Sequence, residues 1–209
     1  MLAAMAPPAK RVVQGSPLHY KSAEATARRG TSIEVAMGES IKIGVSSCLL
    51  GENVRYDGGH KRDPYIVEVL ARFFELVPVC PEFECGLGVP REAMRLEGDP
   101  AAPRLMTHRT RVDLTDRMSA FCQRRVAALA REQLCGFVFK SRSPCCGLHR
   151  LSVFGKARCR RNGRGVFVAA LLQRLPQLPV VDEQALADTR RRDRFVADVR
   201  SWTMRVSQR

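Results

Sequence analysis

The sequence predicts an α/β fold: a Rossmann-like three-layer domain with a mostly parallel sheet. Four short apolar runs have the length of strands, and they lie at residues 41–45, 76–79, 136–139 and 178–181. Segments with apolar side chains at helical spacing separate these runs. The run at 136–139 is apolar throughout, as in a strand that is covered on both faces. Strands that alternate with helices favour a parallel sheet between two helical layers.

In the first half of the chain, the strand at 41–45 runs into Ser46-Ser47-Cys48 and then into a polar, glycine-rich loop at 51–62. Asp63 followed by Pro64 is a helix-start signature, because an aspartate caps the first turn and proline fits its first position. The predicted helix has an apolar stripe formed by Ile66, Val67, Leu70, Phe73 and Phe74. The second strand follows and ends at Cys80.

In the second half, a variable loop with Gly86, Gly88, Pro90 and Gly98 precedes a well-marked helix, which Asp113 or Thr115 can cap. The buried stripe of this helix comprises Met118, Phe121, Cys122, Val126, Leu129 and Leu134. After the third strand come a cysteine-containing segment at 140–147, an arginine-rich turn at 156–161 and a helix at 166–175. The last strand precedes a basic helix that Asp188 caps and that reaches Trp202. We therefore expect a disordered extension at 1–40, a domain at 41–182 and a basic C-terminal helix or tail at 183–209.

Composition narrows the class of protein and its compartment. The 209 residues carry a net charge of +14, which favours contact with polyanions such as RNA, although a genome biased toward arginine gives the same composition. Eight cysteines without a secretory signal predict a reducing, cytoplasmic location, and no apolar run approaches the ~20 residues that span a membrane. The acid-poor segment before residue 41 superficially resembles a mitochondrial transit peptide; Pro7-Pro8 and Gly30 favour a disordered extension instead.

Three cysteines follow three of the predicted strands. Cys48, Cys80 and Cys146 come at or just beyond the strand ends at residues 45, 79 and 139. Because the carboxyl ends of parallel strands meet at one edge of a sheet, the three thiols should converge in one crevice. Thiolates suit a soft metal or an iron–sulfur cluster, and three ligands leave one coordination position free for a substrate.

The other cysteines leave alternatives open. A structural zinc site usually pairs its ligands as C-x₂₋₄-C, and Cys80 with Cys85 has that spacing, with Cys145-Cys146 to complete it. Cys122 and Cys135 are interpreted as small buried hydrophobes, and Cys159 as a surface thiol. Cys85 and Cys145 each lie close to a candidate ligand, so the spacing alone does not decide whether either takes part.

Three segments resemble the signatures of one known family. Residues 45–59 (VSSCLLGENVRYDGG), 77–82 (VPVCPE) and 140–147 (KSRSPCCG) are similar to those of the thiouracil desulfidase family, formerly catalogued as a domain of unknown function. The resemblance runs from about residue 41 to about residue 181. It implies a [4Fe–4S] cluster held by Cys48, Cys80 and Cys146, with the fourth iron binding the sulfur of the substrate. The family usually has serine at position 145 and glycine at position 85.

The implied activity is the replacement of sulfur by oxygen in a thiolated pyrimidine, giving uracil and sulfide. Glu82, beside Cys80, is the first candidate for proton transfer, with Ser47 and Ser141 as further catalytic candidates. The candidates for substrate binding are Asn53, Arg55, Tyr56 and Ser143, although a loop salt bridge is an equal interpretation for Glu52 and Arg55. Larger relatives carry an additional C-terminal domain and act on thiouridine in RNA; residues 186–206 resemble the tail that leads into it, and we expect that domain to be absent here. The rival hypotheses are an RNA-binding module with a structural zinc and a thiol redox protein.

Overall fold

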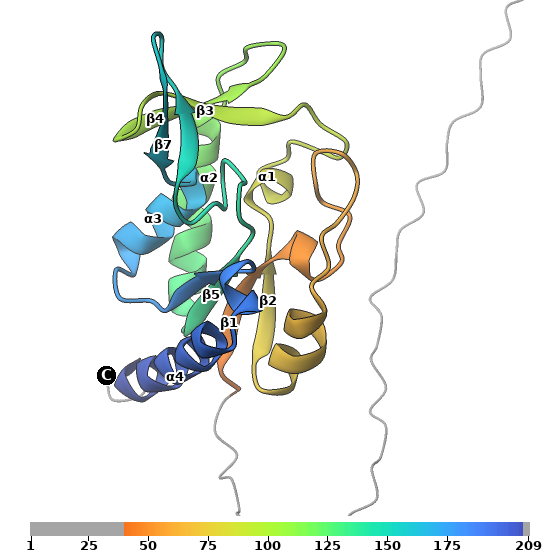
Figure 1. Ribbon diagram of the computed structural model, residues 1–209, viewed down its shortest axis with the longest axis vertical. Helices are drawn as coiled ribbons and strands as arrows, with labels where there is room; N and C mark the ends of the chain where they lie inside the picture. The colour runs from red at the N-terminus through yellow and green to blue at the C-terminus, as the bar shows by residue number, and fades with distance from the viewer. Residues whose placement is uncertain (1–39, 207–209) are drawn as a thin grey trace, which may run out of the picture. The chain divides into compact units, whose positions relative to one another are not determined.

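The computed structural model describes residues 40–206, and its centre is a parallel four-stranded sheet (Figure 1). The strand order is β2-β1-β5-β8, and every neighbouring pair in it is parallel. The bounds are β1, Lys42–Ser46; β2, Glu75–Val79; β5, Gly136–Phe139; and β8, Val180–Asp182. The predicted α/β class and the four predicted strands are therefore confirmed. The expected extension at 1–40 lies outside the described residues except for Ser40.

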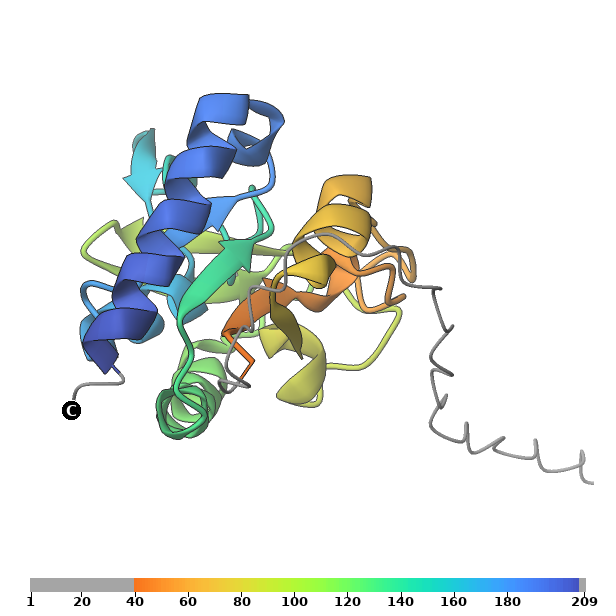
Figure 2. The same cartoon turned by 90° about the horizontal axis from the view of Figure 1, so that it is seen from below.

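Helical segments cover both faces of this sheet, which gives three layers (Figure 2). Side chains alternate along a strand, so Phe137 and Phe139 of β5 pack on one face and Val138 packs on the other. The first face is covered by α2 (Thr115–Arg131) and α3 (Val166–Arg174). The second face is covered by α4 (Thr189–Val206), the π turn η2 (Tyr65–Val69) and the 3₁₀ turn η3 (Leu70–Arg72).

The strand order places a topological switch at the carboxyl edge of β1. From β1 the chain crosses to β2 on one side and later returns to β5 on the other side. Open α/β sheets bind ligands at such a point, because the loops that follow the two strands diverge there and leave a crevice. Cys48 follows β1 within the 3₁₀ turn η1 (Ser47–Leu49), and Cys80 follows β2 and begins α1 (Pro81–Glu84).

The segment after Asp63-Pro64 corrects one expectation. The aspartate does cap it, because Asp63 Oδ1 accepts a hydrogen bond from the backbone N–H of Ile66 at 3.2 Å. The chain then forms a π turn and a 3₁₀ turn rather than a regular helix. Ile66, Leu70 and Phe74 are buried against the sheet, and so short a segment takes its winding from tertiary packing rather than from intrinsic propensity.

A second sheet was not predicted from the sequence. Its order is β4-β3-β6-β7, with antiparallel pairs at both edges and a parallel pair between β3 and β6. The bounds are β3, Met94–Asp99; β4, Ala102–Thr107; β6, Leu151–Phe154; and β7, Cys159–Gly163. The expected loop at 86–98 and arginine-rich turn at 156–161 thus contain strands. Leu96, Leu105 and Val153 are buried among mostly polar or exposed neighbours, so the apolar alternation is too weak to mark these strands.

The C-terminal helix is present and begins where it was expected. The carboxylate of Asp188 accepts a hydrogen bond from the N–H of Arg191 at 3.0 Å, which caps α4. Phe195 and Val199 are buried against the second face of the sheet. Among residues 40–206 the structure contains no helix long and apolar enough to cross a membrane.

Candidate metal centre and substrate cavity

A cavity of about 500 Å³ opens at the carboxyl edge of the central sheet, and the three predicted ligand cysteines line it. Its wall combines the ends of β1 and β2, the loop that follows β5, and Arg91, Ala93 and Met94 before and at the start of β3. Of the other candidate residues, it also includes Ser47, Arg55, Tyr56, Glu82, Ser141 and Ser143. Asn53 is exposed and does not line the cavity.

Local hydrogen bonds fix the backbone around two of the cysteines. The N–H of Cys80 donates to Glu84 Oε1 at 2.7 Å, so this carboxylate closes the first turn of α1 back onto its cap residue. In the loop after β5, the N–H groups of Cys145 and Cys146 both donate to Ser143 Oγ, at 3.2 and 3.1 Å. Each cysteine is therefore presented from a turn whose conformation its own neighbours stabilise.

The three thiols are hard to ionise unless a cation is bound. Burial, together with the nearby Cys80, raises the pKa of Cys48 to about 11, and burial also raises the pKa of Cys80 to about 11. Burial, then the charges of Glu82 and Cys80, raise the pKa of Cys146 well above its ordinary value. A positive metal group would stabilise all three thiolates at once, because ligation requires the deprotonated sulfur.

The donor set therefore fits a thiophilic cofactor. Three thiols and no histidine line the cavity, and soft sulfur ligands select iron–sulfur clusters and other thiophilic metals. Among residues 40–206, no group of three or more histidine, cysteine, aspartate or glutamate side chains is arranged to hold a metal ion, so the fit rests on the chemistry of the thiols that line the cavity and not on a preformed ion site. The alternative of a zinc knuckle at Cys80 and Cys85 gains no geometric support from this arrangement, since Cys85 does not line the cavity.

The adjacent cysteines at positions 145 and 146 face different surroundings. Both are buried and pack in the apolar core between the sheet, α2 and α3, but Cys146 also lines the cavity, whereas Cys145 is fully buried and does not. The carbonyl of Cys145 accepts hydrogen bonds from Phe167 at 3.1 Å and Val168 at 3.4 Å, so the loop rests on the start of α3. Of the two thiols, that of Cys146 is the one available to a ligand in the cavity.

We expect Gly165→Ala to disturb this loop. A Cβ at position 165 would lie 2.3 Å from the carbonyl oxygen of Cys145 and 2.9 Å from the amide nitrogen of Gly147, and neither backbone atom can move without shifting Cys146. Overpacking of this kind costs about 1–3 kcal/mol. A thermal melt should show the lower stability, and iron content after anaerobic reconstitution should fall below that of the unmodified protein. Unchanged melting temperature and iron content would show that the loop does not depend on this close approach.

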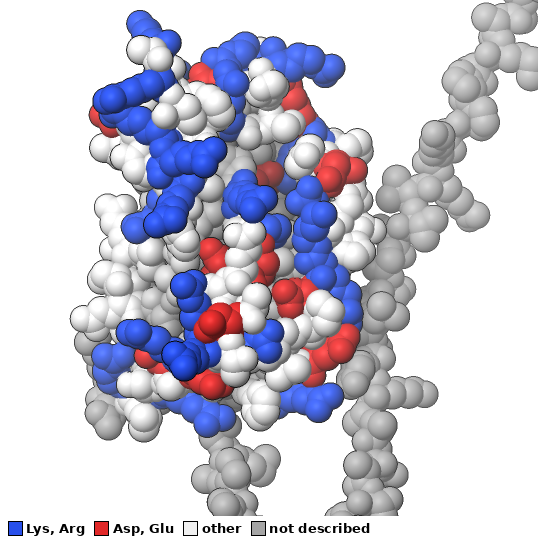
Figure 3. Space-filling view, viewed as in Figure 1, with Lys and Arg blue, Asp and Glu red and all other residues white. Residues whose placement is uncertain are grey.

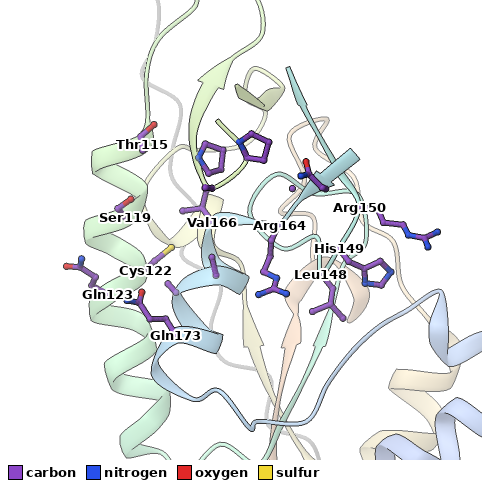
Figure 4. Close-up of a pocket in the computed structure, with 17 residues that line it drawn as sticks. Thr115, Ser119, Cys122, Gln123, Leu148, His149, Arg150, Arg164, Val166 and Gln173 are labelled. Atoms are coloured by element: carbon purple, nitrogen blue, oxygen red, sulfur yellow. The ribbon is translucent and has the colours of Figure 1, made fainter. Parts of the chain in front are cut away.

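The remaining cysteines lie away from the cavity, and all eight cysteines of the chain are free. Cys122 and Cys135 are buried in the apolar cores and Cys159 is exposed, as expected. Cys122 lines a separate cavity of about 540 Å³ between α2, α3 and the loop at 148–150 (Figure 4). Ser119 and Gln123 of α2 and Gln173 of α3 also line that second cavity, which contains none of the predicted site residues.

Glu82 is held by two partners. Arg91 donates to Glu82 Oε2 from Nη2 at 2.6 Å and from Nε at 3.0 Å, and Ser143 Oγ donates to Glu82 Oε1 at 3.2 Å. Both side chains of this ion pair are largely buried, with exposed fractions of 7% for Arg91 and 12% for Glu82. Ser143 thus donates its one proton to Glu82 and accepts from two backbone N–H groups, so its hydroxyl has no free position for a substrate.

Sequence reasoning missed Arg91 and Glu183. Arg91 lies nine residues beyond its partner in a segment that was expected to be a variable loop, and no local pattern marks it. Glu183 follows β8 directly, so it belongs to the same series of strand-end residues as the cysteines, and that position was the available signal. Its carboxylate accepts hydrogen bonds from the backbone N–H and the hydroxyl of Ser141, at 2.7 and 2.6 Å, and pairs with Lys140.

We expect Glu183→Gln to lower stability in a pH-dependent way. Burial opposes ionisation, but the hydrogen bonds from Lys140 and Ser141 outweigh it and hold the pKa of Glu183 below its usual value of 4.5. A carboxyl group whose pKa is lowered by folding stabilises the protein above its unfolded pKa and loses that effect as the pH falls through the folded value. Hydrogen bonds to a charged group contribute about 1.5–3 kcal/mol each, so we expect a loss of about that size at neutral pH.

Urea unfolding of the variant and the unmodified protein, at neutral pH and at steps below pH 4.5, measures this effect. The gap between the two unfolding free energies should narrow as the pH falls. Glu68→Gln is a matched control, because Glu68 is an exposed partner of Arg62 and surface pairs contribute little. A gap that stays constant with pH would contradict the assigned ionisation of Glu183.

Arg55 and Tyr56 form one wall of the cavity. Arg55 donates to both carboxylate oxygens of Asp57, at 3.1 and 2.8 Å, and its guanidinium lies 5.4 Å from the centre of the Tyr56 ring. The salt bridge that was considered for this loop is therefore present for Arg55, with Asp57 as its partner. Tyr56 is 44% exposed, which leaves its ring accessible from the cavity mouth.

Comparison with known proteins decides the family. The 2-thiouracil desulfurase family model matches residues 43–183, which is most of the chain. This chain belongs to that family. A solved structure of a [4Fe-4S]-dependent thiouracil desulfidase, TudS, is similar to it at 26% identity with a TM-score of 0.56, and the match covers 70% of this chain and 93% of the other. A comparison with curated proteins gives no match.

The basic surface does not single out a second function. Lys and Arg side chains gather over the region of β3, β4 and β7 in the view of Figure 3, and elsewhere on this face they are mixed with Asp and Glu. The family match and the structural neighbour both name desulfuration of thiouracil. The alternative of an RNA-binding module with a structural zinc gains no support from them.

Proposed function

We propose that this protein converts a thiolated pyrimidine, 2- or 4-thiouracil, to uracil and sulfide by hydrolysis, with a [4Fe–4S] cluster held by Cys48, Cys80 and Cys146. The observation that carries the proposal is that these three thiols line one cavity at the switch point of a desulfurase-family fold. The neighbouring structure, named as [4Fe-4S]-dependent, supports the choice of cofactor. When bound, a cluster with one iron free of protein ligands supplies a soft Lewis acid for the thiocarbonyl sulfur.

The chain's own residues position the substrate and move protons. A cavity of about 500 Å³ accommodates a single pyrimidine ring with the cofactor, and the Tyr56 ring at its mouth provides an aromatic face. Replacing sulfur by oxygen requires a water to lose protons and the departing sulfide to gain them. Glu82 is the proposed group for one of these transfers at Oε1, since Oε2 accepts two hydrogen bonds from Arg91 whereas Oε1 accepts one, from Ser143, and keeps a further acceptor position.

Three other lining residues complete the proposed assignment. Ser47, at 3% exposure, lies directly before Cys48 and is proposed to hydrogen-bond the ligand-bearing turn or the bound group. Lys140 and Arg55 place positive charge beside Cys48, and both lower the pKa of its thiol against the dominant effect of burial. A buried anionic centre at this place is therefore partly balanced by the chain itself.

The test is anaerobic reconstitution with iron and sulfide, followed by separate incubations with 2-thiouracil and 4-thiouracil. We expect bound iron, a broad absorption in the blue part of the visible spectrum, and release of uracil and sulfide in equal amounts from at least one of the two substrates. Reconstituted protein that carries iron and releases uracil from neither substrate would overturn the proposed reaction. If, at physiological salt, the protein turns over thiolated tRNA but neither free base, the substrate is RNA rather than a free base.

A further inference from the structure

At the cavity wall, Lys140, Ser141 and Glu183 form a hydrogen-bonded group, and the proposed reaction gives no role to Ser141 or Glu183. Lys140 and Ser141 line the cavity, but Glu183 does not. The exposed fractions of the Lys140 and Glu183 side chains are 17% and 14%, so their pairing is largely shielded from solvent. Glu183 is anchored at the end of β8, where its N–H donates to the carbonyl of Phe139 at 3.2 Å.

The contacts in this group use up nearly all the hydrogen-bonding capacity of Ser141. Its hydroxyl donates its only proton to Glu183 Oε1 at 2.6 Å, and its backbone N–H donates to Glu183 Oε2 at 2.7 Å. Lys140 Nζ donates to Ser141 Oγ at 3.1 Å and to the carbonyl of Ser141 at the same distance. A hydroxyl has one donor and two acceptor positions, so a single acceptor position of Ser141 Oγ is left for the cavity.

From this arrangement we infer that Glu183 is a positioning residue that makes Ser141 an acceptor-only group, which selects a ligand presenting an N–H at that point of the cavity. The inference rests on the proposed function for the identity of the ligand as a pyrimidine. Both 2- and 4-thiouracil, and uracil itself, carry ring N–H donors. A ligand that presents a lone pair to Ser141 would leave two acceptors facing each other in a desolvated site, which is costly.

Ser143 is the internal contrast in the same loop. It too is a serine on the cavity wall, yet its hydroxyl has its donor and both acceptor positions occupied by Glu82, Cys145 and Cys146. Only Ser141 of this pair retains a free position, and Glu183 determines that the position is an acceptor. Glutamine at position 183 would present N–H donors as well as one oxygen, which allows the Ser141 proton to turn toward the cavity.

The experiment is a double-mutant cycle on reconstituted protein with Ser141→Ala, Glu183→Gln and the double variant. Two quantities are measured: kcat/KM for 2-thiouracil, and the Kd for uracil by calorimetry, which requires no turnover. We expect each single variant to weaken both quantities by about 10- to 100-fold, the range for one hydrogen bond in a desolvated site. Once Ser141 is alanine, the change at position 183 should add no more than about twofold.

Two controls separate positioning from a general loss of structure. Glu68→Gln removes an exposed carboxylate and should change neither quantity. Methylation of the ring nitrogen whose N–H faces Ser141 should weaken uracil binding by about 10-fold or more in the unmodified protein and by less than about threefold in Ser141→Ala. Iron content and melting temperature are recorded for each variant.

The outcomes distinguish this inference from the proposed reaction. Independent, multiplicative effects of the two substitutions on Kd, or equal binding of uracil and both N-methyluracils, would overturn the role of Glu183. A coupled cycle on Kd in protein that turns over no thiouracil would support the positioning role and overturn the reaction. No detectable uracil binding by the unmodified protein would overturn the inference.

Discussion

Cys146→Ala is expected to abolish both reconstituted iron and desulfidation, whereas Cys145→Ala keeps both. The physical reason is the direction of the two thiols, since Cys146 lines the cavity and Cys145 is fully buried in the apolar core against the start of α3. Loss of one of three proposed ligands removes the geometry that the cofactor requires. Cys145→Ala removes one buried sulfur, which costs on the order of 1 kcal/mol of packing.

Iron and sulfide assays on anaerobically reconstituted variants, followed by the uracil-release assay, measure this difference. Cys48→Ala and Cys80→Ala should behave as Cys146→Ala does, and Cys122→Ala should behave as Cys145→Ala does. If Cys145→Ala loses its iron while Cys146→Ala retains it, Cys145 is the ligand and Cys146 is not. Thermal melts of the variants without cofactor show whether each one folds, and so distinguish the loss of a cluster ligand from the loss of the fold.

Glu82→Gln is expected to lower kcat by about 10²- to 10⁴-fold, the usual contribution of a positioned general acid or base. The amide keeps the shape of the side chain and retains one oxygen for Arg91 or Ser143, but it does not move a proton. Iron content should stay near that of the unmodified protein, because Glu82 is not a proposed ligand. The measurement is single-turnover uracil release, which isolates the chemical step from product release.

Arg91→Lys provides the matched control for that variant. Lysine keeps the charge beside Glu82 but loses the fork of two donors, so we expect a smaller loss of kcat than in Glu82→Gln. If Glu82→Gln retains most of the activity at unchanged iron content, the proton-transfer group lies elsewhere in the cavity. An equal loss of kcat in both variants would show that Glu82 maintains the structure of the cavity wall and does not transfer a proton.

The central sheet and the positions of the three cysteines along it could be predicted from the amino-acid sequence alone. Each of the four strands coincides with a short run rich in apolar residues, and the central strand β5 is apolar and buried along its whole length. Burial on both faces leaves such a run in the sequence regardless of what packs against it. Because Cys48, Cys80 and Cys146 all follow such runs, their convergence at one edge follows from parallel pairing alone. The three ordered signatures were local in the sequence as well, so the family could be named from them.

The pairings between distant residues depend on the folded chain and could not be predicted from local sequence. Whether Cys145 or Cys146 faces the cavity depends on α3, whose first turn contacts the loop from about twenty residues further along the chain. Glu82 meets Arg91, and Ser141 meets Glu183, through contacts that no periodicity encodes. The second sheet was not predicted for a related reason. Each of its strands buries few side chains, and these apolar side chains form a buried surface only when β3, β4 and β6 lie side by side.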